Sequence, residues 1–218
     1  MMSSVERMAE AATSRMIERL RARGIRDESV LAAMQRVPRA RFVEDGLALN
    51  AYDDTPLPIG FQQTISQPIV VARMLEILLA GRASLGRTLE VGAGCGYQAA
   101  VMSSLASEVF AVERIRGLIE AAKENLRPLR LANVRMKHAD GMLGLAQVAP
   151  FDSIIVAAGA PQIPVALVEQ LAPGGRLLAP VGDQSTQQLV LVERRENNTF
   201  TESRYDVVRF VPLLAGTE

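Results

Sequence analysis

The stretch Leu89-Glu90-Val91-Gly92-Ala93-Gly94-Cys95-Gly96-Tyr97 decides the fold of this chain. It begins as an apolar strand and leads into a helical stretch, so its glycines predict a tight turn between a strand and a helix. Residues without side chains let a ligand approach the backbone, and a helix N-terminus adds unpaired N–H groups and a positive dipole end. The stretch therefore predicts a turn that binds a carboxylate or a phosphate.

The spacing of these glycines is more informative than their presence, because a lone glycine turn is weak evidence of any one ligand. A dinucleotide-binding fingerprint places its third glycine at position 97, where this chain has Tyr97. The pattern Glu-x-Gly-x-Gly-x-Gly fits S-adenosylmethionine better than NAD.

Short apolar strands alternate with helical stretches on both sides of this turn, which favours an α/β fold with a doubly wound, Rossmann-like parallel sheet. We expect these strands at 88–91, 109–112, 134–137, 151–156 and 176–179. We expect the helices between them at 98–105, 118–129 and 165–171. Two later strands, 188–193 and 205–212, have a polar turn between them and should pair antiparallel.

The chain before this core reads as a helical preface followed by a loop. Apolar residues recur every three or four positions from Val5 to Leu20, and a second helix runs from a cap at Asp27 to the Val37-Pro38 stop. Prolines and a glycine interrupt residues 50–67, so we expect an ordered loop there and a helix from Pro68 to Gly81. We expect a single domain over 1–218, with the preface at 1–50, the loop at 51–68 and the core at 69–218.

Composition narrows the class of protein. The 218 residues carry 24 Lys plus Arg and 24 Asp plus Glu, so the chain lacks the positive field typical of nucleic-acid binding, and we expect no nucleic-acid partner. A single cysteine cannot form an internal disulfide, and charged residues interrupt the amino-terminal segment where a signal peptide needs an apolar run. We expect a cytoplasmic monomer with no membrane segment and no metal site.

Acidic residues follow two further strands of the predicted sheet. Glu113 lies 113 − 92 = 21 positions after the first glycine, where a carboxylate accepts from a ribose diol. Asp140-Gly141 follows the next strand, where the acid can accept from an adenine amino group and the glycine keeps the rim open. Each acid alone is more often a solvated loop residue. Together with the glycine turn they favour a cofactor site at the carboxyl edge of the sheet.

The loop Ala51-Tyr-Asp-Asp-Thr-Pro-Leu-Pro-Ile-Gly-Phe-Gln-Gln-Thr-Ile-Ser-Gln-Pro68 closely resembles the signature of protein-L-isoaspartate O-methyltransferases. The resemblance spans nearly the whole chain. It continues through 37–43, 89–100, 112–114, 149–156, 171–177 and the Val208-Arg-Phe-Val-Pro-Leu213 segment.

That resemblance implies a repair enzyme that methylates the free carboxylate of L-isoaspartyl residues in damaged proteins. It places around S-adenosylmethionine the residues Ile65, Ser66, Glu90, Gly92, Gly94, Gly96, Glu113, Asp140 and Gly141. It also implies that Thr64, Ile65, Ser66 and the Val211 backbone hold the isoaspartyl peptide as an extended strand. Ser66 would orient the carboxylate, and Glu90 would help to position cofactor and substrate. The order of the last two strands is switched in this family relative to most other methyltransferases.

Some positions depart from the usual family pattern or have simpler interpretations. Phe61, Gln62 and Ile69 differ from the common residues, and Gly159 stands where alanine is usual, which bears on rate and peptide preference. Cys95 is best interpreted as a small packing residue and His138, the only histidine, as structural. Ser66 taken alone could be a helix cap before Pro68.

Two other functions remain open on the sequence. A DNA amino-methyltransferase is expected to carry an Asn/Asp-Pro-Pro-aromatic run after the fourth strand, and this chain has Ala157-Ala-Gly-Ala-Pro161 there. A small-molecule methyltransferase uses the same sheet. An adaptor that keeps only the cofactor pocket is expected to have lost its substrate-side residues, whereas Thr64 to Ser66 are intact.

Overall fold

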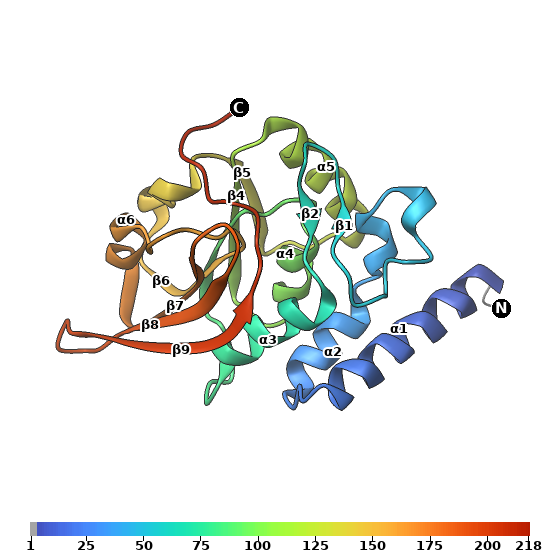
Figure 1. Cartoon of the computed structure of the whole chain (residues 1–218), viewed down its shortest axis with the longest axis horizontal. Coiled ribbons are helices and arrows are strands. Elements are labelled where there is room, and N and C mark those ends of the chain that lie inside the picture. Colours follow the sequence, from blue (N-terminus) through green and yellow to red (C-terminus); the bar gives the residue numbers. More distant parts are fainter. Residues whose placement is uncertain (1–3) are drawn as a thin grey trace.

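The computed structural model describes the backbone of residues 4–218 and the side chains from residue 7 onward. Within this part, a seven-stranded sheet has the order β5-β4-β3-β6-β7-β8-β9 (Figure 1). The strands are β3 (Arg87–Val91), β4 (Glu108–Glu113), β5 (Val134–His138), β6 (Phe151–Val156), β7 (Leu171–Gly182), β8 (Gln187–Arg194) and β9 (Phe200–Val208). Strands β3 to β7 are parallel, and β8 and β9 are antiparallel to their neighbours. The predicted α/β class and the predicted antiparallel pair are confirmed.

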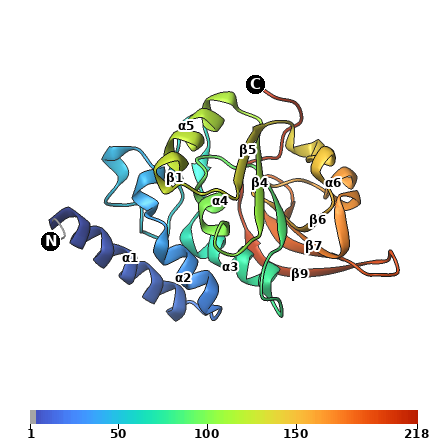
Figure 2. The ribbon, with the colours of Figure 1, turned by 180° about the vertical axis from the view of Figure 1, so that it is seen from behind.

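The helices are α1 (Ser4–Ala22), α2 (Glu28–Arg36), α3 (Pro68–Leu79), α4 (Tyr97–Met102), α5 (Arg116–Leu126) and α6 (Val165–Glu169). Short 3-10 turns lie at Arg39–Phe42, Asp45–Leu47, Arg127–Leu129, Gly141–Leu143 and Ala146–Val148. The Asp27 side chain caps α2 by accepting from the backbone N–H groups of Ser29 and Val30. The helical preface is present, with α1 and α2 together on one side of the molecule (Figures 1 and 2). None of the described helices is long and apolar enough to cross a membrane.

Alternation along the strands divides the buried residues between two faces of the sheet. Leu89 and Val91 point to the face that carries α6, where they share a core with residues of that helix. Glu90 falls between them in the sequence and therefore faces the opposite side, where Gln98 of α4 bonds its carboxylate. Glu113 lies on the same face as Glu90, because Glu90 is paired with Ala111 of β4 and Glu113 follows two residues later. The face that α4 covers thus carries two acidic residues at the carboxyl edge.

The loop at 51–68 differs from its prediction as an irregular segment. Two short antiparallel strands, β1 (Leu57–Pro58) and β2 (Thr64–Ile65), form a hairpin that stands beside α5 (Figure 1). Leu57 and Ile65 are both buried and paired with each other, so burial of two side chains stabilises a hairpin that prolines obscure in the sequence. Phe61 and Gln62 adopt positive φ at its tip.

Two strand boundaries were also predicted wrongly. Strand β7 begins at Leu171 rather than 176, through a Pro-Gly-Gly segment that no apolar alternation marks. Strand β9 begins at Phe200 rather than 205 and ends at Val208, and most of its residues are exposed because it forms the edge of the sheet. A strand whose two faces are both exposed to solvent has no alternation of apolar and polar residues by which its bounds could be predicted. Strands β7, β8 and β9 follow one another in chain order at this edge.

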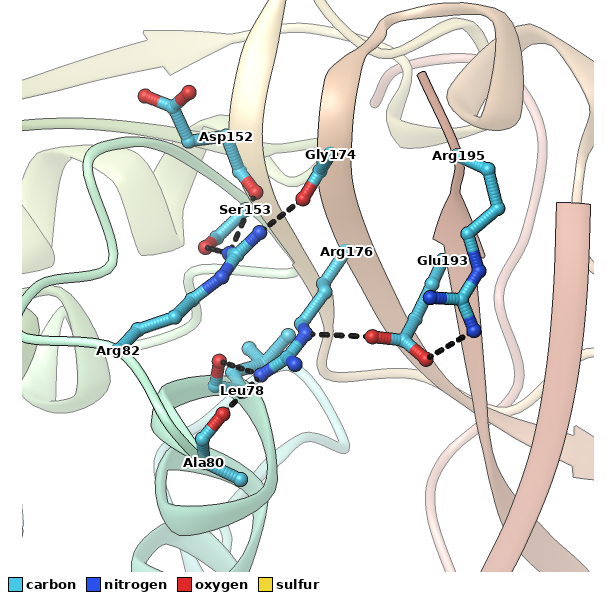
Figure 3. Close-up of polar contacts among 9 residues, drawn as sticks. All are labelled: Leu78, Ala80, Arg82, Asp152, Ser153, Gly174, Arg176, Glu193 and Arg195. Carbon is cyan, nitrogen blue, oxygen red and sulfur yellow. Dashed lines mark hydrogen bonds and ion pairs between the residues drawn. The ribbon is translucent and has the colours of Figure 1, made fainter. Parts of the chain in front are cut away.

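Arginines secure the amino end of the sheet (Figure 3). Arg176 of β7 donates to the Leu78 and Ala80 carbonyls at the end of α3, at 3.2 and 2.6 Å, and to Glu193 of β8 at 2.9 Å. Arg82 donates to the Asp152 and Gly174 carbonyls. Arg176 thereby supplies donors to carbonyls that the end of α3 leaves without intrahelical partners, and Arg82 bonds backbone carbonyls of β6 and β7.

Candidate active site

Two cavities and a groove adjoin one another at the carboxyl edge of the sheet. The turn cavity lies between the glycine turn and the tail segment, which we define as residues 210–214. The inner cavity surrounds the Glu90 side of the turn. The groove lies between the hairpin, the β7–β8 turn and the tail segment. Thr64 of the hairpin and Ala157, which follows β6, line all three spaces. The two cavities and the groove therefore share a wall at these residues.

The glycine turn has the conformation that its spacing predicts. Gly92, Gly94 and Gly96 have φ of 86°, 52° and 87°, a region that side chains disfavour. Gly92 and Gly94 line both the turn cavity and the inner cavity. Gly96 lines neither, and a Cβ there would lie 3.2 Å from Leu126 of α5. Gly92 and Gly94 therefore keep the walls open, while Gly96 allows the helices to pack closely.

Glu90 is a buried carboxyl group with an unused oxygen. Its exposed fraction is 1%, and Gln98 Nε2 donates to Oε1 at 3.0 Å. Oε2 has no hydrogen-bond partner within the described residues. Burial, opposed by the Gln98 hydrogen bond and aided by the nearby charge of Glu113, raises the pKa of Glu90 to about 8. An orphaned buried acceptor at a cavity wall calls for a donor on a ligand.

Glu113 lines the turn cavity at the end of β4. Its two oxygens accept from the backbone N–H groups of Gly94 and Ile115, each at 3.0 Å. These bonds fix the carboxylate and tie it to the glycine turn. A carboxylate has about four lone-pair sites, so two acceptor positions are left for a ligand.

Asp140 precedes Gly141, which lines the turn cavity, and does not line the cavity itself. Its oxygens accept from the backbone N–H groups of Met142, at 2.8 Å, and Gly216, at 2.7 Å. Gly141 lines the turn cavity itself, and a Cβ there would lie 2.5 Å from Val91 Cγ1. The structure therefore brings Gly141 into the cavity and uses Asp140 to hold the chain after the tail segment across the end of β5.

The hairpin brings Thr64, Ile65 and Ser66 to the site. Ile65 is 4% exposed and, like Ser66, lines the inner cavity, and Ser66 also lines the groove. The N-cap of α3 is Gln67, without a side-chain cap bond, and the Ser66 hydroxyl forms no hydrogen bond within the described chain. Ser66 is therefore not the helix cap that its sequence position allows, and its hydroxyl is available to a ligand.

Arg39 bonds the backbone before and after this hairpin and was not predicted as a site residue. Its guanidinium is fully buried and donates to the carbonyls of Ala51 and Ser66, each at 2.6 Å, and it lies 4.6 Å from the Tyr97 ring centre. Burial lowers the pKa of Arg39. The sequence signal was the Val37 to Val43 segment, which carried the family resemblance without indicating what its arginine contacts.

Cys95 and His138 occupy structural positions. Burial raises the pKa of the Cys95 thiol to about 11, so the group is protonated and unreactive at neutral pH. His138 Nε2 lies 2.8 Å from the Arg114 carbonyl and 3.2 Å from that of Glu218. Both placements agree with their interpretation as packing and structural residues. Groups of three or more His, Cys, Asp or Glu suited to a metal ion are absent from the described residues.

Comparisons with known proteins agree with this geometry. Residues 11–218 match the family model of protein-L-isoaspartate (D-aspartate) O-methyltransferase. The chain belongs to this family. A protein-L-isoaspartate O-methyltransferase of Azoarcus sp. (strain BH72) is 68% identical over 96% of each chain, and one of Dechloromonas aromatica (strain RCB) is 58% identical over all of both.

A solved structure extends the family comparison to the cofactor. The beta-aspartate methyltransferase of Plasmodium falciparum, solved with S-adenosyl-L-homocysteine, superposes with a TM-score of 0.80. It is 28% identical, and the match covers 91% of this chain and 96% of that one. The family uses S-adenosylmethionine, and the orphaned Glu90 oxygen and the side-chain-free turn fit such a ligand.

Proposed function

We propose that this chain transfers a methyl group from S-adenosylmethionine to the free carboxylate of L-isoaspartyl residues in damaged proteins and so initiates their repair. The observation that carries the proposal is the position of Ser66. Its free hydroxyl stands on the wall that separates the inner cavity from the groove. Membership of the isoaspartate methyltransferase family supports the same reaction.

We assign the two cavities to the cofactor. S-adenosylmethionine, when bound, supplies an electrophilic methyl group on a sulfonium. Gly92 and Gly94 give it access to the backbone, and Glu113 offers its remaining lone pairs to a ribose diol. The unused Oε2 of Glu90 accepts from an ammonium group. Two further residues line these cavities, Ile65 in the inner cavity and Gly141, preceded by Asp140, in the turn cavity. Gly96 lies outside both cavities and allows the turn to pack against α5.

The chain activates its acceptor by position rather than by a base. A carboxylate with a pKa near ~4 is already ionised at neutral pH, so its oxygen is a nucleophile without proton transfer. The residues lining the cavities and the groove include no histidine or lysine. Ser66 donates a hydrogen bond that orients the carboxylate, and the hairpin excludes water from it. Proximity and desolvation are sufficient for this reaction.

Selectivity for the isoaspartyl linkage follows from the same arrangement. The backbone of an isoaspartyl residue runs through the side-chain methylene, so its free α-carboxylate stands on a shorter stem than a normal aspartyl carboxylate. Thr64, Ile65 and the Val211 backbone fix the flanking peptide, and the stem then decides where the oxygen lies. A displacement of about 1 Å costs on the order of a hundredfold in rate.

The test compares kcat/KM for two peptides of identical composition that differ only in this linkage. The isoaspartyl peptide should be methylated and its aspartyl twin should be nearly inert. Equal rates would reject repair and leave a less selective methyltransferase. Methylation of neither peptide by a protein that binds S-adenosylhomocysteine would point to an adaptor or to another acceptor.

The same proposal includes the setting in which the enzyme works. We propose a monomer in the cytoplasm that meets its substrates as damaged proteins or peptides, with no nucleic-acid or membrane partner. The balanced charge and the single buried cysteine support this setting. Light scattering at working concentration tests the monomer, and a mass of twice 23.6 kDa would reject it.

A further inference from the structure

Gln187 joins the two sides of the groove through one buried side-chain amide. It stands at the start of β8 with an exposed fraction of 3%. Its Nε2 donates to the Asp183 carbonyl in the β7–β8 turn at 2.6 Å, and its Oε1 accepts from the Phe210 N–H at 2.6 Å. Both ends of the amide are therefore committed to backbone groups of segments that line the groove.

Gly159 provides the space that this amide occupies. A Cβ at position 159 would lie 2.8 Å from Gln187 Cδ, closer than Cβ atoms come to other heavy atoms, and 3.0 Å from its Nε2, so the amide would have to shift. The Gly159 backbone also donates to the Val211 carbonyl at 2.8 Å and accepts from the Leu213 N–H at 2.7 Å. The glycine at this position, where the sequence departs from its family resemblance, is thus coupled to Gln187.

The tail segment is hydrogen-bonded by both Gln187 and Gly159, and some of its main-chain groups remain without a hydrogen bond. Gln187 holds Phe210, and Gly159 holds Val211 and Leu213. Within the described residues, the Phe210 and Pro212 carbonyls and the Val211 N–H form no hydrogen bond. These residues line the groove, so an extended peptide finds free backbone partners there.

We propose that Gln187 is a positioning residue for the peptide substrate and that Gly159, which has no side chain, leaves the space that the Gln187 amide occupies. This inference rests on the proposed function. Gln187 acts through the tail segment, because its hydrogen bond fixes the position of the Phe210 backbone. It does not itself react. Both residues line the groove, and neither lines the turn cavity or the inner cavity. Their loss should therefore weaken peptide binding and leave cofactor binding intact.

The first experiment replaces Gln187 by Ala and uses Gln188→Ala as its matched control. Gln188 is the next residue of β8 and donates to the Tyr205 carbonyl of β9 at 2.9 Å, but it lies outside the groove. Two lost hydrogen bonds at the groove predict a KM for the isoaspartyl peptide raised about tenfold, with kcat little changed. The dissociation constant of S-adenosylhomocysteine should stay at the wild-type value, and the control should keep both constants. A Gln187→Ala enzyme with the control's KM would overturn the proposal.

A double-mutant cycle tests the coupling with Gly159. Gly159→Ala should raise KM as Gln187→Ala does, because the new methyl group displaces the amide. The double variant should then be no worse than Gln187→Ala alone, whereas independent roles would multiply the two effects. Multiplied effects would reject the coupling. If Gln187→Ala does not fold, Gln187→Glu keeps the acceptor for the Phe210 N–H and loses the donor to the Asp183 carbonyl. An unchanged KM in Gln187→Glu would count against the positioning role of Gln187.

Amide hydrogen exchange separates failure of this inference from failure of the proposed function. The Phe210 N–H should exchange faster in Gln187→Ala than in the wild type, whatever the enzyme methylates. Wild-type protein that methylates neither peptide refutes the repair function alone. Unchanged exchange at Phe210 refutes the positioning role of Gln187 even in an active enzyme.

Discussion

The two ends of the central sheet both carry buried polar groups, but they satisfy them differently. At the amino end, Arg82 and Arg176 donate to carbonyls of α3, β6 and β7, and Glu193 pairs with Arg176 (Figure 3). At the carboxyl end, Glu90 keeps an unpartnered oxygen and Arg39 an unpartnered nitrogen within the described residues. The amino end has one such atom too, Nε of Arg87, but it lies 3.8 Å from a carboxylate oxygen of Glu108, whereas Glu90 lines a cavity.

This difference separates structural polar clusters from a binding site. A satisfied cluster is complete without a ligand, and its value lies in the free energy of unfolding. An orphaned buried acceptor costs free energy until a ligand supplies its partner. We therefore expect substitutions at the carboxyl end to change binding and turnover, and those at the amino end to change stability.

The largest expected effect comes from the glycine turn. Gly94→Val places a branched side chain at φ 52°, where Cβ would lie 3.1 Å from Ile59 Cδ1 and project toward two cavities. Cofactor binding should be abolished while the fold is retained. Calorimetry with S-adenosylhomocysteine measures the affinity, and circular dichroism checks the fold. A folded variant with wild-type affinity would remove the turn from the cofactor site.

Ser66→Ala should come next in size. The hydroxyl caps no helix and has no partner in the described chain, so its loss should change the melting temperature little. If it orients the acceptor, kcat/KM for the isoaspartyl peptide should fall by about a hundredfold. Melting and kinetics measured on the same preparation decide between these roles. Normal turnover in the variant would mean that the Ser66 hydroxyl does not orient the acceptor carboxylate.

Glu90 should give a smaller, pH-dependent effect. Its raised pKa, about 8, means that the empty folded protein holds a proton that the unfolded chain releases near 4.5. Stability of the empty protein should therefore decrease as the pH rises from about 4.5 to about 8. An ammonium ligand favours the ionised form, so affinity for S-adenosylhomocysteine should increase over the upper part of this range, by at most about tenfold per pH unit. Glu90→Gln should bind more weakly at pH 8 and lose both trends, and a wild type with flat affinity would refute the pairing.

Much of the fold and part of the site could be predicted from the sequence. The turn at 92–96 has the positive φ angles that its glycines indicate, and the strand before it was placed within one residue. Glu113 could be placed at the cavity because parallel strands end at one edge of the sheet. Local pattern and the βαβ rhythm together determine these features.

The features that escaped prediction depend on contacts between distant segments. Arg39 bonds the Ser66 carbonyl across 27 positions, and Gln187 bonds the Phe210 N–H across 23. Neither pairing has a periodic or spacing signal, because each side chain meets a backbone group through tertiary packing. Asp140 shows the converse case, since its position after β5 could be predicted from the strand pattern but its bond from the Gly216 N–H could not be foreseen.

The smallest effect on activity is expected from the amino end, at Arg176. Removing its guanidinium in Arg176→Ala leaves the Leu78 and Ala80 carbonyls without their donor and leaves Glu193 with Arg195 as its ion-pair partner. The Arg176 side chain is 19% exposed, so water replaces only part of what is lost. The free energy of unfolding should fall by about 1–3 kcal/mol. The same variant should keep its kcat/KM for the isoaspartyl peptide and its cofactor affinity when assayed well below its melting temperature, because the carboxyl-edge cavities and groove receive no contact from Arg176. Urea denaturation and kinetics on one preparation test both halves. Lost activity at unchanged stability would mean that the two ends are coupled through β7, and the comparison between them would then fail.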